Sequence, residues 1–132
     1  MTFFSLIILY SLFRIKHFAC DFLFQTDWMA LTKGKPGKEG YHALFIHAGI
    51  HALGALAIVL LFAPTLWWLF FVDFIMHAGI DRFKGSLTFK RGWLPKDTIF
   101  WWSFGMDQEA HNFCHLAYII IIVVALGGIA TI

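Results

Sequence analysis

Histidine and aspartate recur one helical turn apart in four separate stretches of the sequence. Residues four positions apart lie on the same face of a helix, so two such side chains can present their ligand atoms to one point. With seven histidines and eight acidic residues in the chain, chance alone places a His, Asp or Glu four residues after a histidine about once. Here four histidines have such a partner. The groups are His17 and Asp21, His47 and His51, His77 and Asp81, and Asp107 with His111 and His115.

Imidazole and carboxylate groups held in this way are typical ligands of a divalent metal ion. The combination suits zinc, manganese or iron, of which we expect zinc or manganese, and facing helices of a bundle can assemble such sites. The eight candidate ligands exceed what one four-coordinate ion requires, so two ions, or one ion with surrounding hydrogen-bond partners, fit the set. The candidate ligands are His17, Asp21, His47, His51, His77, Asp81, Asp107 and His111.

Other polar side chains beside these groups extend the candidate site. A bound divalent ion makes its water more acidic and polarises a scissile group, while an unligated Asp or His can act as a general base. The predicted catalytic carboxylates are Asp21, Asp81 and Asp107. The residues predicted to support the ligands or to contact substrate are Gln25, Lys84, Gln108 and His115.

The elements that carry these residues are expected to lie in a membrane. The 132 residues are 60% hydrophobic and only 14% charged, which is too apolar for a soluble fold of this size. Residues 40–72 contain no Asp, Glu, Lys or Arg. The net charge is only +2, and the basic residues form no helix or arm that could grip nucleic acid, so we expect no nucleic-acid partner. We predict a single integral membrane domain over residues 1–132.

Hydropathy and the breaks between apolar stretches predict an all-α, four-helix transmembrane bundle. Glycine, proline and charge mark loops at residues 33–38 and 90–95, and Pro64 marks a short connection. The first predicted helix is longer than the roughly 20 residues that a span needs, so it must be tilted, kinked or partly outside the lipid. The predicted helices cover residues 3–31, 41–62, 65–83 and 103–132.

Positive charge is concentrated on one side of the predicted bundle. Cytoplasmic loops carry an excess of Lys and Arg, and eight of the ten basic residues fall in two regions on the same side. Both termini are therefore predicted to be non-cytoplasmic. The His and Asp groups lie near the loop-rich ends of their helices, which places the polar site in the cytoplasmic half. The eight basic residues are Lys33, Lys35, Lys38, Arg82, Lys84, Lys90, Arg91 and Lys96.

Two other interpretations of the polar residues stay open. Polar side chains also hydrogen-bond between membrane helices simply to hold them together, although buried ionisable groups are costly and often functional. The same residues can instead line a metal-ion or proton path. Residues 58–61 and 119–124, in the outer half, are almost wholly apolar, which disfavours a path through one protomer but allows a path between the protomers of a homo-oligomer.

Several motifs along the chain together form a signature that covers most of its length. They are His17-x-x-x-Asp21-Phe22-x-x-Gln25, Lys33, His47, His77-x-x-x-Asp81-x-x-Lys84 and Asp107-Gln108-x-x-His111. This signature resembles the family called domain of unknown function 3307. The resemblance implies a small integral membrane protein of bacteria or their phages, in the bacterial inner (cytoplasmic) membrane, and it brings no activity with it. The His-x-x-x-Asp pattern alone is more loosely similar to membrane-bound metal-dependent hydrolases, although Glu, common in two-metal bundles, is scarce here.

The leading hypothesis is a membrane-embedded metal-dependent hydrolase that acts on a phosphate ester or lipid at the cytoplasmic leaflet. One alternative is a metal-ion or proton transporter or channel component. Another is a non-enzymatic phage or bacterial accessory membrane protein, in which the polar network only rigidifies the bundle. A measurement of metal content would distinguish the hydrolase hypothesis from the accessory-protein hypothesis. Phosphate release and ion flux, measured together, would distinguish the hydrolase from a transporter.

Overall fold

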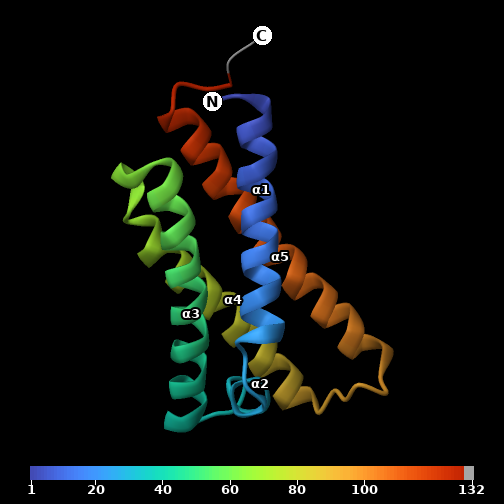
Figure 1. Cartoon of the computed structure of the whole chain (residues 1–132). Helices are drawn as coiled ribbons and strands as arrows, with labels where there is room; N and C mark the ends of the chain where they lie inside the picture. Colours follow the sequence, from blue (N-terminus) through green and yellow to red (C-terminus); the bar gives the residue numbers. More distant parts are fainter. Residues whose placement is uncertain (130–132) are drawn as a thin grey trace.

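A computed structural model describes residues 1–129 as a set of packed helices (Figure 1). The predicted all-α class is confirmed for these residues. The helical elements, in chain order, are α1 (Phe3–Phe18), a π-helical turn (Ala19–Leu23), α2 (Asp27–Thr32), α3 (Lys38–Phe62), a 3-10 turn (Pro64–Leu66), α4 (Leu69–Arg91) and α5 (Thr98–Ala125).

Within the described residues, three helices are long and apolar enough to cross a membrane. They are α1 together with its π-helical turn (Phe3–Leu23), α3 and α5. The remaining long helix, α4, has 23 residues but carries Asp73, Asp81 and several basic side chains. Length and composition therefore indicate a membrane protein, with three of its helices apolar enough to span by themselves.

More polar side chains are buried, and more large apolar side chains are exposed, than is usual in a soluble protein. Six of the seven histidines are buried, together with three aspartates and a lysine. Large apolar side chains face outward instead, and Leu61, Phe83 and Met106 are 75%, 74% and 73% exposed. An apolar exterior of this extent is unfavourable in water, whereas lipid tails solvate it well.

The polar and apolar interiors occupy opposite ends of the bundle. α3 and α4 pack side by side, and α5 packs against α4 and crosses α1 (Figure 1). The two ends of the described chain meet where the Met1 ammonium donates a hydrogen bond to the Gly128 carbonyl (2.8 Å). The apolar core lies at this end and includes Leu9, Phe13, Ile58, Val59, Leu69 and Ile122. The end that holds α2 and the α4–α5 connection is therefore left for the polar residues.

The prediction of one helix over residues 3–31 was wrong, because the helix breaks after the π-helical turn. In that turn the Phe24 amide bonds to the Ala19 carbonyl (2.9 Å), and the backbone becomes extended at Thr26. The Thr26 hydroxyl accepts a hydrogen bond from the Met29 amide (3.3 Å) and so caps α2. The break divides a predicted helix that was too long for one membrane span. The threonine that caps α2 was the local feature of the sequence that indicated it.

The predicted third helix, residues 65–83, was also placed wrongly at both ends. α4 begins only at Leu69, after the 3-10 turn, and continues to Arg91. Gly92 ends it in the left-handed conformation (φ 66°), with backbone amides bonded back into the last turn. A glycine in this position is a common helix stop, and the charged residues before it remain helical.

The other two predicted helices differ at their beginnings. α3 begins at Lys38 rather than at residue 41, and α5 begins at Thr98 rather than at residue 103. α5 ends at Ala125, whereas the prediction extended it to residue 132. Residues 130–132 of that prediction lie outside the described residues.

The connection between α2 and α3 lies against α4 at a contact between two glycines. A Cβ added to Gly85 would lie 2.8 Å from the Gly34 Cα atom, whereas a Cβ added to Gly79 meets no described atom within 4 Å. We expect Gly85→Ala to lower the free energy of unfolding by about 1–3 kcal/mol. Gly79→Ala, on the same helix, should leave it unchanged or raise it by up to about 1 kcal/mol. Thermal unfolding in detergent measures both, and equal effects would contradict the close contact.

Candidate metal centre

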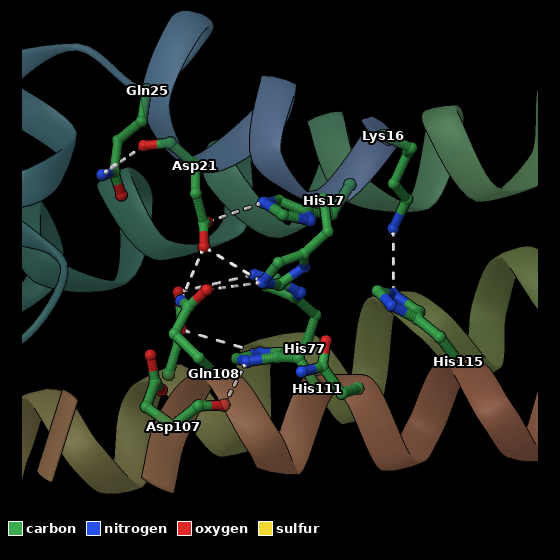
Figure 2. Close-up of polar contacts among 12 residues, drawn as sticks. Lys16, His17, Asp21, Gln25, His77, Asp107, Gln108, His111 and His115 are labelled. Atoms are coloured by element: carbon green, nitrogen blue, oxygen red, sulfur yellow. Dashed lines mark hydrogen bonds and ion pairs between the residues drawn. The ribbon is translucent and has the colours of Figure 1, made fainter. Parts of the chain in front are cut away.

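Asp21 is the carboxylate at which polar side chains from three helices converge (Figure 2). It lies in the π-helical turn after α1, and such turns are frequent at functional sites. Its Oδ1 atom lies 3.1 Å from His51 Nε2 and 3.3 Å from His47 Nε2, both on α3. Its Oδ2 atom lies 3.2 Å from His17 Nε2 and accepts a hydrogen bond from Gln108 Nε2 on α5 (2.9 Å). The helices α1, α3 and α5 are thereby joined at one group.

Asp81 on α4 is a second point of convergence beside the first. Its Oδ2 atom lies 3.4 Å from His47 Nε2 and 3.7 Å from His77 Nε2. Its Oδ1 atom lies 3.8 Å from His111 Nε2. The Lys33 ammonium, from the connection after α2, donates a hydrogen bond to Oδ2 at 2.6 Å. Since His47 lies close to both carboxylates, Asp21 and Asp81 belong to one continuous cluster.

Two overlapping sets of side chains in this cluster bring potential metal-ligand atoms close together. In each set, one ligand atom from every residue lies within 4.8 Å of the corresponding atoms of the others. His77 is common to both sets, so the two candidate positions are adjacent. The first set is Asp21, His47, His51 and His77, and the second is His77, Asp81 and His111.

Several buried imidazole nitrogens of these sets have no hydrogen-bond partner among the described residues. They include Nε2 of His47, His77 and His111. His47 Nε2 lies 3.3 Å and 3.4 Å from two carboxylates, but neither approach has the alignment of a hydrogen bond. A buried polar atom without a partner costs about 1–3 kcal/mol, so such atoms are uncommon in folded proteins. Imidazole lone pairs gathered beside carboxylates fit a divalent cation.

Most of the predicted ligands fall in the two sets. His17 lies outside them, and its Nε2 atom instead lies 3.2 Å from the Gln108 side-chain oxygen and 3.2 Å from Asp21 Oδ2. Asp107 also lies outside them. The predicted ligands inside the sets are Asp21, His47, His51, His77, Asp81 and His111.

Asp107 contacts the cluster through its backbone. Its carbonyl accepts a hydrogen bond from His111 Nδ1 (2.8 Å), which directs the opposite ring nitrogen, Nε2, toward Asp81. A donated bond from one imidazole nitrogen commonly orients the other toward a metal. The Asp107 side chain is buried, and its Oδ1 atom has no partner among the described residues. This carboxylate is therefore available for a role other than ligation.

The remaining predicted residues take different positions around the cluster. Gln108 bridges His17 and Asp21 through the two ends of its amide. Gln25 bonds to the backbone carbonyl of Asp21 (3.0 Å) rather than to its carboxylate. Lys84 lies with its ammonium 5.3 Å from the centre of the Phe104 ring. Gln108 is thus a direct partner of the cluster, whereas the other two lie at its edge.

Two lysines have contacts that sequence reasoning missed. Lys33 was interpreted as a positive-inside residue, yet it bonds to Asp81. Lys16, for which no partner was predicted, is buried with its ammonium 3.3 Å from Asp73 Oδ2 and 3.4 Å from His115 Nε2. His115 therefore belongs to this neighbouring ion pair rather than to the ligand sets. The available signal was that a lysine within an apolar helix needs an acidic partner, but its position along the sequence does not identify that partner.

An open cavity of about 680 Å³ connects the cluster with the loop-rich end of the bundle. We call it the site cavity. Its inner wall includes Asp21, Asp81 and Asp107, and lysines also line it. A ligand that enters the site cavity can reach both carboxylates of the cluster and the side chain of Asp107.

The helices and the cluster define an all-helical membrane protein with a buried His and Asp centre. The chain belongs to the family described as protein of unknown function (DUF3307), whose match covers residues 8–131. The predicted family resemblance is thereby confirmed. No curated protein and no solved structure matches the chain, and the looser similarity to membrane-bound metal-dependent hydrolases receives no support from these comparisons.

Proposed function

We propose that this protein is a membrane-embedded metal-dependent hydrolase that acts on a phosphate ester or lipid at the cytoplasmic leaflet. The observation that carries the proposal is the pair of overlapping ligand sets, with ligand atoms within 4.8 Å of one another. Asp21 and Asp81, one carboxylate from each set, lie at the inner wall of a cavity that lysines also line, and the histidines lie behind them. Buried ligands, access from one side and a lysine without an ion-pair partner, Lys84, at the same place suit the hydrolysis of an anionic ester.

In this proposal α4 is the fourth transmembrane helix of the bundle. Asp73, His77 and Asp81, one turn apart, are all buried, whereas Ile75 and Phe83 face outward. Charged groups inside a membrane protein face the bundle interior in this way. The basic residues at the loop-rich end support a cytoplasmic position for that end under the positive-inside rule. Both termini then lie on the other side of the inner membrane.

The proposed chemistry divides the work among the residues of the cluster. One or two zinc or manganese ions, held by the two ligand sets, would supply Lewis acidity and an acidified water. Asp107 lines the site cavity but lies outside both sets, so its carboxylate accepts the proton of the attacking water. His17 and Gln108 hold the Asp21 carboxylate in place. Lys84 pairs with the phosphate of the substrate.

Elemental analysis of detergent-purified protein, prepared without chelators, tests the metal centre. We expect about one or two zinc or manganese ions per chain. His77→Ala should lose the metal, because His77 belongs to both sets, and Asp81→Ala should empty the second set, whose one carboxylate it removes. His42→Ala is the matched control, since His42 is exposed on α3. Metal-free wild-type protein would contradict the proposal and favour a structural polar network.

A metal-ion or proton path is the second candidate function. The observation that favours it is that the ring of His115 lies 5.3 Å from that of His17, which extends the polar cluster toward the Lys16 and Asp73 pair. Beyond this pair the apolar core fills the bundle. Ion flux in liposomes, measured beside phosphate release, decides between the two functions. Flux without hydrolysis would favour the path, and hydrolysis without flux the enzyme.

A further inference from the structure

The site cavity combines charged groups with an apolar wall. Lys33, Lys35 and Lys84 line it together with the three aspartates of the inner wall, and most of its other side chains are aromatic or aliphatic. Lys33 is paired with Asp81 at 2.6 Å, but the Lys84 ammonium lies over the rings of Phe104 and Phe100, 5.3 Å and 6.0 Å from their centres. Lys84 is therefore held by aromatic faces and can pair with an anion. A small hydrophilic phosphate would not need such walls.

A second cavity, of about 460 Å³, runs between α4 and α5. We call it the α4–α5 groove. Ile80, Phe83 and Leu87 form its wall on α4, and Met106 and Ala110 contribute from α5. Phe83 and Met106 are among the most exposed side chains of the protein. The groove is therefore open on the outer surface of the bundle, where the proposed membrane places lipid chains.

The site cavity and the α4–α5 groove meet at shared residues. Lys84, Trp93 and Asp107 line both of them. A molecule that occupied both would thus place an apolar part in the groove and an anionic part beside Lys84. Its polar end would lie next to the carboxylate that we propose as the general base. This arrangement matches an amphiphile at the level of the headgroups.

We propose that the substrate is an anionic lipid drawn sideways from the bilayer, with an alkyl chain in the α4–α5 groove and its headgroup in the site cavity. This inference rests on the proposed function and narrows its substrate to a lipid. The Lys84 ammonium selects an anionic headgroup, because it forms no ion pair among the described residues, whereas Lys33 is already paired with Asp81. The groove selects a long chain, because its burial between apolar side chains is favourable.

Lipid binding is tested by native mass spectrometry of the detergent-purified full chain, with chelator present so that hydrolysis does not consume the probe. We expect long-chain phosphatidic acid to bind at least about tenfold more tightly than long-chain phosphatidylcholine or a four-carbon-chain phosphatidic acid. Lys84→Met should remove the preference for the anionic headgroup. Lys90→Met, at an exposed position of the same helix, should keep it.

A second pair of variants tests the groove separately from the charge. Ala110→Trp fills the α4–α5 groove and should weaken binding of the long-chain lipid about tenfold. Ala117→Trp adds the same bulk at an exposed position of α5 outside both cavities and should change little. Equal binding of phosphatidic acid and phosphatidylcholine, or of long and short chains, would overturn the inference.

The outcomes also distinguish this inference from the proposed function. Equal hydrolysis of glycerol phosphate and of long-chain phosphatidic acid would overturn the lipid substrate and leave the hydrolase in place. Selective binding of the anionic lipid without any hydrolysis in the metal-loaded protein would support the lipid site and contradict the hydrolase.

Discussion

Asp107→Asn should lower the rate of phosphate release by about 10²–10⁴-fold while the bound metal stays in place. The carboxylate of Asp107 lies outside both ligand sets but lines the site cavity. Its Oδ1 atom has no hydrogen-bond partner among the described residues. Asparagine has nearly the same shape and keeps the backbone carbonyl that orients His111, but it cannot accept the proton of the attacking water. Steady-state phosphate release and elemental analysis of the same preparation measure the two effects.

Glu109→Gln is the matched control for this substitution. Glu109 is an acidic residue on the same helix, but it is exposed and its side chain bonds to Asn112. Its amide variant should hydrolyse substrate at the wild-type rate. If Asp107→Asn also lost the metal, Asp107 would be a ligand. If it kept both metal and activity, the general base would have to be another residue of the cluster.

Asp73→Leu should destabilise the protein by about 3–5 kcal/mol, because it leaves a buried ammonium without a counter-ion. The side chains of Lys16 and Asp73 are only 6% and 3% exposed, with 3.3 Å between Lys16 Nζ and Asp73 Oδ2. The lysine stem is also confined, since a Cβ added to Gly54 on α3 would lie 2.8 Å from Lys16 Cγ. The ammonium therefore has little room to move away. Denaturant or thermal unfolding in detergent measures the loss.

The double variant Lys16→Met with Asp73→Leu should recover most of that stability. It replaces both charges by apolar side chains, and such replacements are often neutral or stabilising at buried ion pairs. It should also keep the wild-type metal content, because neither residue belongs to a ligand set. A double variant as unstable as Asp73→Leu alone would contradict the account, since the cost would then come from packing and not from the unpaired charge.

Hydropathy and local spacing were enough to predict an all-helical chain and the helix faces on which its polar residues lie. His77 and Asp81 are four residues apart, and both are buried on one face of α4, as the helical period requires. Two helix boundaries were also open to local reasoning and were missed. Thr26 caps α2 and Gly92 ends α4, and such capping signals are independent of hydropathy and charge.

Ion pairs between residues far apart in the sequence could not be predicted from local spacing. Lys16 and Asp73 are 57 residues apart, and Lys33 and Asp81 are 48 apart. Both pairs depend on how far each helix is turned, tilted and shifted against its neighbours. Packing determines these quantities, for example where Gly34 meets Gly85.

The sequence by itself determined an all-helical, membrane-type chain whose His and Asp side chains lie on shared helix faces, because these properties follow from residue type and from the period of the helix. Only the tertiary structure decided which of those side chains form the two ligand sets. It also showed that Asp107 lies outside both ligand sets and that His115 contacts Lys16. The physical reason is that side chains from different helices meet only where packing brings the helices to the same depth and rotation.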